Sequence, residues 1–434
     1  MPSKAEDLLN SLDKERDTSG PWILKLYDTC EADPSVAFDL VLLRVRGDER
    51  LIHETMRIVI GLVPFLELPK LVEAVLGEAE RAEKLDPAIE MLEMIAEQSP
   101  EAFHHVLARY FEVAVRFMSA DYLLQRSSSQ LSVPWARTGK LHFEFLKQQI
   151  KTGDERRKGL AWYALLRCGY RKAYDHARVP LNMPPFKPLV LHDILMDVGI
   201  AGDYKPLHTE EPLYMVYEIE LARRDTPMPG NPDFSDVVGR RDATFNPPER
   251  LPHKYPFGGA LDVTCGMCRK PLHRMMRLDP VPETLSKVCM LKKLDLATCY
   301  SCSGWIEGIL YFCHDDAGEL TDPWTRRTRE AKPEWPSAPI VPTTVTLGRA
   351  DARWNVLSPF MGNQDRVGGP PVWVQQANYP SCPSCSQEMR FIAQLGRDDY
   401  PTTDGGHVQF GSGGSLYAFW CDKCRVSANF WQCT

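Results

Sequence analysis

The sequence predicts an α+β multidomain protein in which an α-helical repeat region precedes a β-rich region with two four-cysteine sites. Three observations predict this. Apolar residues recur with helical spacing as far as residue 178, only eight of the 35 prolines lie before residue 179, and eleven of the 13 cysteines lie between residues 265 and 433. We therefore expect four parts: a helical domain at 1–178, a proline-rich connector at 179–250, and β-rich modules at 251–330 and 331–434.

The first part is expected to consist of short amphipathic helices. One apolar face at i, i+3, i+4 and i+7 is formed by Ala88, Met91, Leu92 and Ile95. Ser99-Pro100 is typical of a helix start, and further starts are expected near residues 35, 50, 67 and 87. Such a succession favours a HEAT- or armadillo-like array. No residue motif recurs at a fixed period, so a compact helical bundle stays open as an alternative.

Strand signals dominate after residue 250. Short runs of aromatic and β-branched residues occupy 309–312, 371–375 and 415–420, and the connector holds one further run at 214–219. Seven of the ten tryptophans follow residue 300, which suits small β-rich folds with aromatic cores.

Eight cysteines form two CxxC…CxxC quartets, which are Cys265, Cys268, Cys299 and Cys302, and Cys382, Cys385, Cys421 and Cys424. Two cysteines three residues apart in a tight turn can direct both sulfurs to one centre, and a second turn completes a tetrahedron of thiolates around Zn²⁺. The pattern predicts two zinc ions per chain in closed, structural sites. An iron–sulfur cluster is a less fitting alternative. His273, Cys289, Cys313, His314 and Cys433 lie nearby as possible substitute ligands, although we interpret them as ordinary buried or surface residues.

Composition and motifs narrow the function. No run of about 18 apolar residues occurs, and the acidic N-terminal segment lacks the apolar stretch of a secretory signal, so we expect a cytoplasmic protein without membrane contact. The net charge of −7 argues against a general nucleic-acid binder. The sequence holds no GxGxxG after a strand, Walker loop, GxSxG or HExxH, so we expect no enzyme activity.

One segment departs from this acidic balance, because residues 101–178 carry 14 basic and seven acidic side chains. The dense part of this segment supplies our candidate partner contacts, namely Arg156, Arg157, Lys158, Arg171 and Lys172. They form either a solvated helix face or a docking surface for an acidic partner, which is a protein or a nucleic acid. A second basic run, Trp324–Arg329, is interpreted as a flexible contact loop.

The two quartets resemble a diverged tandem repeat, since Gly258-Gly259 precedes the first and Gly368-Gly369 precedes the second. The second copy carries a fuller pattern: GGPPVW at 368–373, Gln375, the first CxxC, Met389, Phe391, Gln394-Leu395, and SLYAFWC at 415–421. This order resembles the superfamily of bacterial YwqG-like proteins and eukaryotic programmed cell death protein 2. The resemblance covers about residues 368–424, and 257–320 more weakly, where the Pro and Trp of the motif are missing.

The resemblance implies a β-rich, non-enzymatic domain that binds proteins or peptides, and it makes Trp373 and Gln375 candidate contacts. Members of the superfamily look like immunity proteins against toxins or chaperones of a ribosomal protein. We therefore expect a protein-binding protein whose partner is a toxin or a client polypeptide. The alternative is a zinc-ribbon nucleic-acid binder that uses the basic helical segment 137–178.

Overall fold

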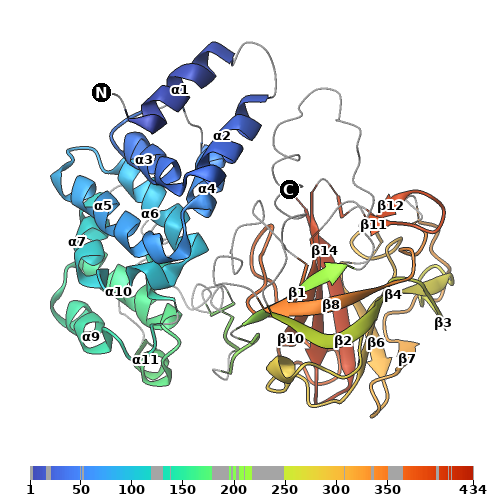
Figure 1. Ribbon diagram of the computed structural model, residues 1–434. Coiled ribbons are helices and arrows are strands. Elements are labelled where there is room, and N and C mark those ends of the chain that lie inside the picture. Colours follow the sequence, from blue (N-terminus) through green and yellow to red (C-terminus); the bar gives the residue numbers. More distant parts are fainter. Residues whose placement is uncertain are drawn as a thin grey trace. The chain divides into compact units, whose positions relative to one another are not determined.

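The computed structural model describes most of the chain. The described residues are 3–15, 21–48, 50, 53–118, 131–136, 138–177, 195–196, 199–201, 205–209, 211–217, 249–306, 308–333, 337–349, 365–396, 400–408, 410–411 and 413–433. They divide into two compact units, a helical unit up to residue 196 and a β unit from residue 199 onward (Figure 1). Most of the expected proline-rich connector lies outside the described residues.

The helical unit confirms the helical character expected for residues 1–178. Its helices are α1 (Lys4–Glu15), α2 (Pro21–Ala32), α3 (Pro34–Val45), α4 (His53–Leu62), α5 (Leu68–Arg81), α6 (Asp86–Gln98), α7 (Leu107–Phe117), α9 (Phe143–Thr152), α10 (Glu155–Arg167) and α11 (Arg171–Ala177). Helices that follow one another in the chain pack together, as α3 does with α4 and α5 with α6. A HEAT-like repeat stays a prediction.

Local sequence explains where these helices begin. The Asp33 carboxylate accepts a hydrogen bond from the Ser35 amide (3.2 Å) at the start of α3, and Pro34 occupies its first turn. Asp154 caps α10 in the same way through the Arg157 amide (3.0 Å). The expected helix at Ser99-Pro100 is split, since residues 100–103 form a 3-10 turn and α7 begins only at Leu107.

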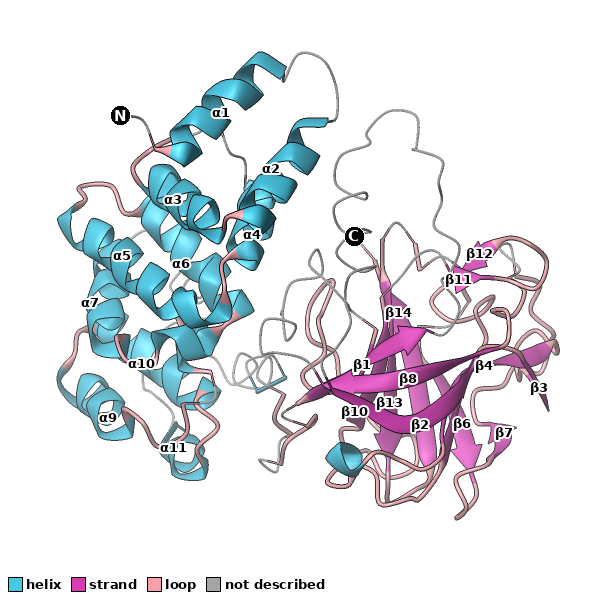
Figure 2. Cartoon of the chain, in the orientation of Figure 1, coloured by secondary structure: helices cyan, strands magenta, loops and turns pink. Residues whose placement is uncertain are grey.

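The β unit is built on one antiparallel, near-barrel sheet (Figure 2). Its strands run in the order β3-β4-β2-β8-β1-β9-β10-β13-β14-β6-β7, and β5 pairs with β4. Their bounds are β1 (Pro212–Tyr217), β2 (Glu249–Phe257), β3 (Ala260–Thr264), β4 (Pro271–Leu278), β5 (Leu294–Thr298), β6 (Leu310–His314), β7 (Leu320–Pro323), β8 (Thr343–Arg349), β9 (Arg366–Gly368), β10 (Arg390–Leu395), β13 (Ser415–Cys421) and β14 (Val426–Gln432). A separate pair is β11 (Tyr400–Pro401) and β12 (His407–Val408).

This topology corrects the expected division into a connector and two β modules. Strand β1, from the connector, pairs with β8 and β9 inside the sheet, and β6 pairs with β14 across the expected boundary at residue 330. Asn429 of β14 also binds β5, through the carbonyl oxygen of Ala297 (2.7 Å) and the hydroxyl of Thr298 (2.8 Å). The two copies therefore share one sheet. The expected strand at 371–375 is absent from this sheet, because that segment lies outside the named strands.

The sheet nevertheless retains the signature of a duplication. Around the central β8–β1 pair, β2 and β4 on one side occupy the places of β9 and β10 on the other. Strand β5 pairs with β4 as β13 pairs with β10. We call the first set (β2–β6) the first half and the second (β9–β14) the second half. The expected tandem repeat is thus visible as matching positions within one sheet.

The glycine pairs occupy matching positions in the two halves. Gly258, Gly259, Gly368 and Gly369 all have φ between 69° and 88°, a left-handed conformation that glycine adopts without strain. A Cβ at Gly369 would lie 2.6 Å from the side chain of Pro212, and one at Gly258 would lie 2.8 Å from the carbonyl oxygen of Val341. The backbone therefore turns where a neighbouring segment passes too closely for any side chain.

Candidate metal centres

The structure brings together all eight cysteines of the two predicted quartets. Cys265, Cys268, Cys299 and Cys302 form the first centre, and Cys382, Cys385, Cys421 and Cys424 form the second. In each centre the four sulfur atoms lie within 4.8 Å of one another. Each centre joins a loop that precedes β4 or β10 to the residues that follow β5 or end β13.

The sulfur spacing fits a four-coordinate ion. Cys268 Sγ lies 3.7 Å from Cys299 Sγ, and Cys385 Sγ lies 3.7 Å from Cys421 Sγ. Four sulfurs placed 2.3 Å from a central Zn²⁺ at tetrahedral angles are about 3.8 Å apart. A disulfide would bring two sulfurs to about 2 Å, and all eight cysteines are free thiols. Each centre can therefore hold one metal ion.

The first CxxC of each half folds into the same turn. The amide of Arg269 donates to the carbonyl oxygen of Cys265 (3.0 Å), and that of Ser386 donates to the carbonyl oxygen of Cys382 (2.8 Å). Arg269 and Ser386 both have positive φ, 59° and 57°. We call these turns, residues 265–270 and 382–387, the first and second knuckle. In this turn both sulfurs point to one side, as the spacing predicts.

The thiols of a centre perturb one another strongly. Hydrogen bonding with Cys299 lowers the pKa of Cys265, and the same contact raises the pKa of Cys299. Four thiolates so close together repel one another, so without a cation part of the set stays protonated. A divalent cation removes this cost, and its binding releases protons. The donor set therefore favours a thiophilic cation.

The two centres differ in how they are covered. The four cysteines of the first centre are all buried, whereas Cys385 and Cys424 of the second are half-buried. Gly266 and Met267, between the cysteines of the first knuckle, are also buried, while the corresponding Pro383 and Ser384 are exposed.

The cover of the first centre is a segment that we call the strap, residues 323–331. Its Arg327 and Ala331 amides donate to the carbonyl oxygens of Gly266 (3.1 Å) and Met267 (2.9 Å). In the opposite direction, the guanidinium of Arg269 donates a hydrogen bond to the carbonyl oxygen of Arg327 (2.6 Å). The strap contains the run Trp324–Arg329, which we expected to be a flexible loop. These bonds instead hold it against the knuckle. Sequence reasoning missed this role, because the spacing of the cysteines carries no information about what covers them.

None of the possible substitute ligands belongs to either four-sulfur group. The Nδ1 atom of His273 accepts from the Tyr300 amide (3.3 Å), and His314 Nε2 lies 2.8 Å from the hydroxyl of Ser427. Burial lowers the pKa of both histidines to about 4, so both rings are neutral at pH 7. Burial also raises the pKa of Cys289 to about 11 and raises that of Cys313, and Cys433 is half-buried.

The candidate partner contacts of the helical unit differ in exposure and in whether they pair with an acidic side chain. Arg157 forms a bidentate ion pair with Glu112 (2.8 and 2.5 Å), which raises the pKa of Arg157, and Arg171 lies 4.0 Å from Asp175. Arg156 and Lys158 are half-buried, and Lys172 is exposed. All five residues lie on α10 or α11.

The two candidate contacts of the second half hold the motif segment on the sheet. Trp373 packs its ring against Tyr417 (centroids 4.8 Å apart) and is stacked over Phe419 (6.2 Å, 11° between planes). Gln375 is exposed, yet its amide side chain donates to the carbonyl oxygen of Cys433 (2.7 Å). Both residues thus have a structural task in the folded chain.

Comparison with known proteins adds one relative. The chain is 26% identical over 298 residues to the "Uncharacterized protein YpfL" of Salmonella typhimurium, a match that covers 67% of this chain and 62% of that protein. The chain thus spans less than two thirds of the relative's length. No family model and no solved structure matches the chain. Among the described residues, no helix is long and apolar enough to cross a membrane.

Proposed function

We propose that this chain is a non-catalytic binding protein for a specific protein partner, with two Zn²⁺ ions that stabilise its β unit. The observation that carries the proposal is the closure of both centres, because four sulfurs fill a tetrahedral shell and leave no position for water or substrate. Zn²⁺ suits four soft thiolates and this geometry better than hard or square-planar cations.

Structural zinc is useful here because both centres bind segments that are distant in the chain. Each joins two turns separated by about 30 residues, and metal binding in such modules contributes on the order of 10 kcal/mol to folding. Free thiolates persist in a reducing compartment, which is consistent with a cytoplasmic site of action.

A protein partner is favoured by the surfaces of the helical unit. A shallow, open groove of about 930 Å³ is lined by residues of α1, α2 and α3, among them Lys4, Leu8, Asp28 and Val36. Grooves between helices commonly accept a partner's amphipathic segment. The partner would be a toxin or a client polypeptide, as the superfamily resemblance implies. Nucleic-acid binding through 137–178 is less favoured, since Arg157 and Arg171 already pair with acidic groups.

The proposal is tested by isolating the partner. We expect the tagged full chain to recover one protein in stoichiometric amount from nuclease-treated source lysate, and the purified pair to reassociate in calorimetry. Asp7→Lys, in the lining of the groove, should weaken this binding, and Arg156→Glu/Lys172→Glu should weaken it further by removing the candidate contacts on α10 and α11. Lys84→Glu/Lys287→Glu, which makes the same charge change as the second variant elsewhere on the surface, should not weaken it. Retention of nucleic acid alone, or turnover of a substrate by the pure chain, would overturn the proposal.

A further inference from the structure

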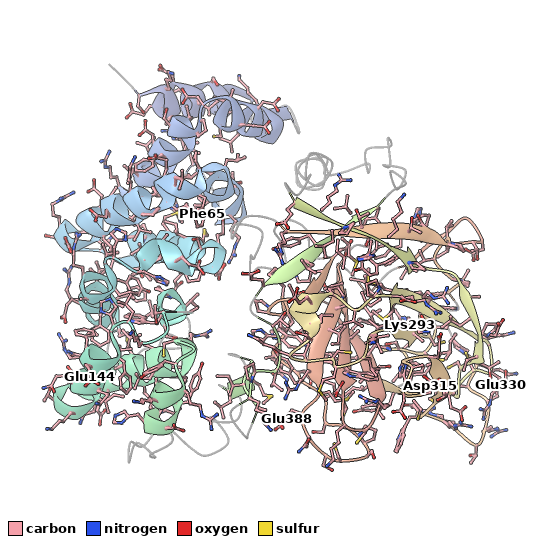
Figure 3. The ribbon with its side chains drawn as sticks, turned by 60° about the horizontal axis from the view of Figure 1, so that its bottom comes forward. Phe65, Glu144, Lys293, Asp315, Glu330 and Glu388 are labelled. Atoms are coloured by element: carbon pink, nitrogen blue, oxygen red, sulfur yellow. The ribbon has the colours of Figure 1, made fainter. Side chains whose placement is uncertain are left out.

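Basic side chains gather where the strap crosses the first knuckle. The exposed ones from the strap, the knuckle and the residue after the strap are Arg269, Lys270, Arg326, Arg327, Arg329 and Lys332. The acidic side chains of the same stretch are Glu330, and Asp322 just before the strap, which pairs with Arg326. In a chain of net charge −7 this is a local excess of positive charge. Figure 3 shows Glu330, near the strap's end, at the periphery of the β unit.

Two partly exposed indole rings flank these charges. Trp324 is 45% exposed and Trp305 is 43% exposed, both more than a globular surface usually leaves to tryptophan. One side of Trp305 packs on Trp431, with ring centroids 5.0 Å apart.

The structure holds these groups in fixed positions. The amides of Trp324 and Thr325 both donate to the carbonyl oxygen of Tyr311 (2.8 and 3.1 Å), which attaches the strap to β6. The guanidinium of Arg327 donates to the carbonyl oxygen of Ile306 (3.1 Å), the neighbour of Trp305. The strap, the first knuckle and the segment of Trp305 are therefore hydrogen-bonded to one another before any ligand arrives. We call the exposed basic side chains and the two indoles that these segments carry the strap face. Such preorganisation lowers the entropy cost of binding.

We propose that the strap face binds single-stranded nucleic acid. Lys270, Arg329 and Lys332 would meet phosphates, and the two indoles would stack on unpaired bases. A duplex would keep its bases stacked inside and leave the indoles without a partner, and an acidic peptide would use the charges alone. The inference goes beyond the proposed protein binding, because it adds a second class of ligand and places it on the β unit.

The test is fluorescence anisotropy of the full chain with a labelled oligo(dT) of about 15 nucleotides at low salt. Trp324→Ala should weaken binding about tenfold, because one stacking ring is lost. Arg329→Glu/Lys332→Glu should weaken it at least about tenfold and reduce the slope of log affinity against log salt by about 1.4, since two phosphate contacts to a single strand are lost. Lys84→Glu/Lys287→Glu, with the same charge change, should bind as the unchanged chain does.

All substituted side chains are exposed, so two metal ions per chain and unchanged circular dichroism are expected of every variant. Arg329→Gln/Lys332→Gln replaces the charge reversal if that variant loses metal. The proposal fails if the chain does not bind the oligonucleotide at low salt, or if the strap variants bind as well as the control. It also fails if polyglutamate displaces the probe at a lower concentration than unlabelled oligo(dT), which would indicate an acidic protein as the ligand.

Discussion

The two halves of the β unit build nearly the same sulfur cluster but cover it differently. Both place sulfurs 3.7 Å apart in matching turns, at matching places in the sheet. The first half hides its cluster beneath the strap, whereas the second leaves Cys385 and Cys424 half-buried and instead lays its motif segment, with Trp373, on the sheet. The difference shows that the cysteine spacing determines the cluster, while unrelated segments determine how far solvent reaches it.

Ligand removal should have the largest effect, and it should be larger in the covered centre. Cys299→Ser is expected to lower the metal content from two to one and to destabilise the β unit by about 4 kcal/mol or more, because no water can replace the buried ligand. Cys385→Ser should destabilise the β unit less, since water can reach the coordination position that the Cys385 sulfur would leave. Elemental analysis and urea unfolding measure both. Cys313→Ser is the control and should keep two ions. A larger loss of stability in Cys385→Ser than in Cys299→Ser would contradict the stated difference between the covered and the exposed centre.

The next effect concerns the motif segment of the second half, which Trp373 holds on the sheet. Trp373→Ala should destabilise the β unit by about 2–3 kcal/mol, because the stack on Tyr417 and Phe419 is lost from a half-buried site. Trp324→Ala, at a tryptophan that is 45% exposed, should cost less, about 1 kcal/mol. Urea unfolding of the two variants compares them directly. Equal losses would show that Trp373 does not hold the motif segment on the sheet.

A smaller effect is expected from one added methyl group in the first knuckle. A Cβ at position 266 would lie 2.3 Å from the carbonyl oxygen of Thr325, so Gly266→Ala must displace the strap. The expected cost is about 1–3 kcal/mol. The corresponding position in the second knuckle is the exposed Pro383, where Pro383→Ala adds no atom and displaces no neighbour, so it should change stability by less than about 1 kcal/mol. Similar thermal midpoints for the two variants would contradict the role given to the strap.

The mildest perturbation changes no residue. Brief exposure to a chromogenic zinc chelator should remove one ion per chain quickly and the other slowly, because half-buried thiolates are open to attack by the chelator and buried ones are not. The fast phase should be missing from Cys382→Ser and present in Gly266→Ala, in which both ions should leave quickly. A single slow phase in the unchanged chain would show that exposure of Cys385 and Cys424 does not govern release.

Local patterns predicted the site better than they predicted the architecture. The cysteine quartets follow from spacing alone, because a CxxC turn is a local structure and all eight residues meet as expected. The starts of α3, α5 and α6, expected near residues 35, 67 and 87, each have a proline in the first turn, and α3 also has the Asp33 cap. The division into β modules failed because strand pairing is non-local. Nothing in the run at 214–219 indicates that β1 lies between β8 and β9.

The candidate partner contacts also show that sequence patterns do not reveal contacts between distant segments. The density of Arg and Lys near residue 157 was visible in the sequence, but their ion pairs depend on Glu112 and Asp175 in the fold. Trp373 and Gln375 stood out as motif residues, yet their contacts with Tyr417 and Cys433 appear only once the segment is placed on the sheet. Composition identifies reactive or charged groups, and the fold decides which of them are already engaged.

The central claim is that both four-cysteine centres hold structural zinc. Elemental analysis of the purified full chain tests it most directly, together with unfolding in the presence of a strong chelator. The account predicts two zinc ions per chain, and loss of the β unit's cooperative unfolding once both are removed. A chain that carries iron, or that stays fully folded without metal, would contradict it.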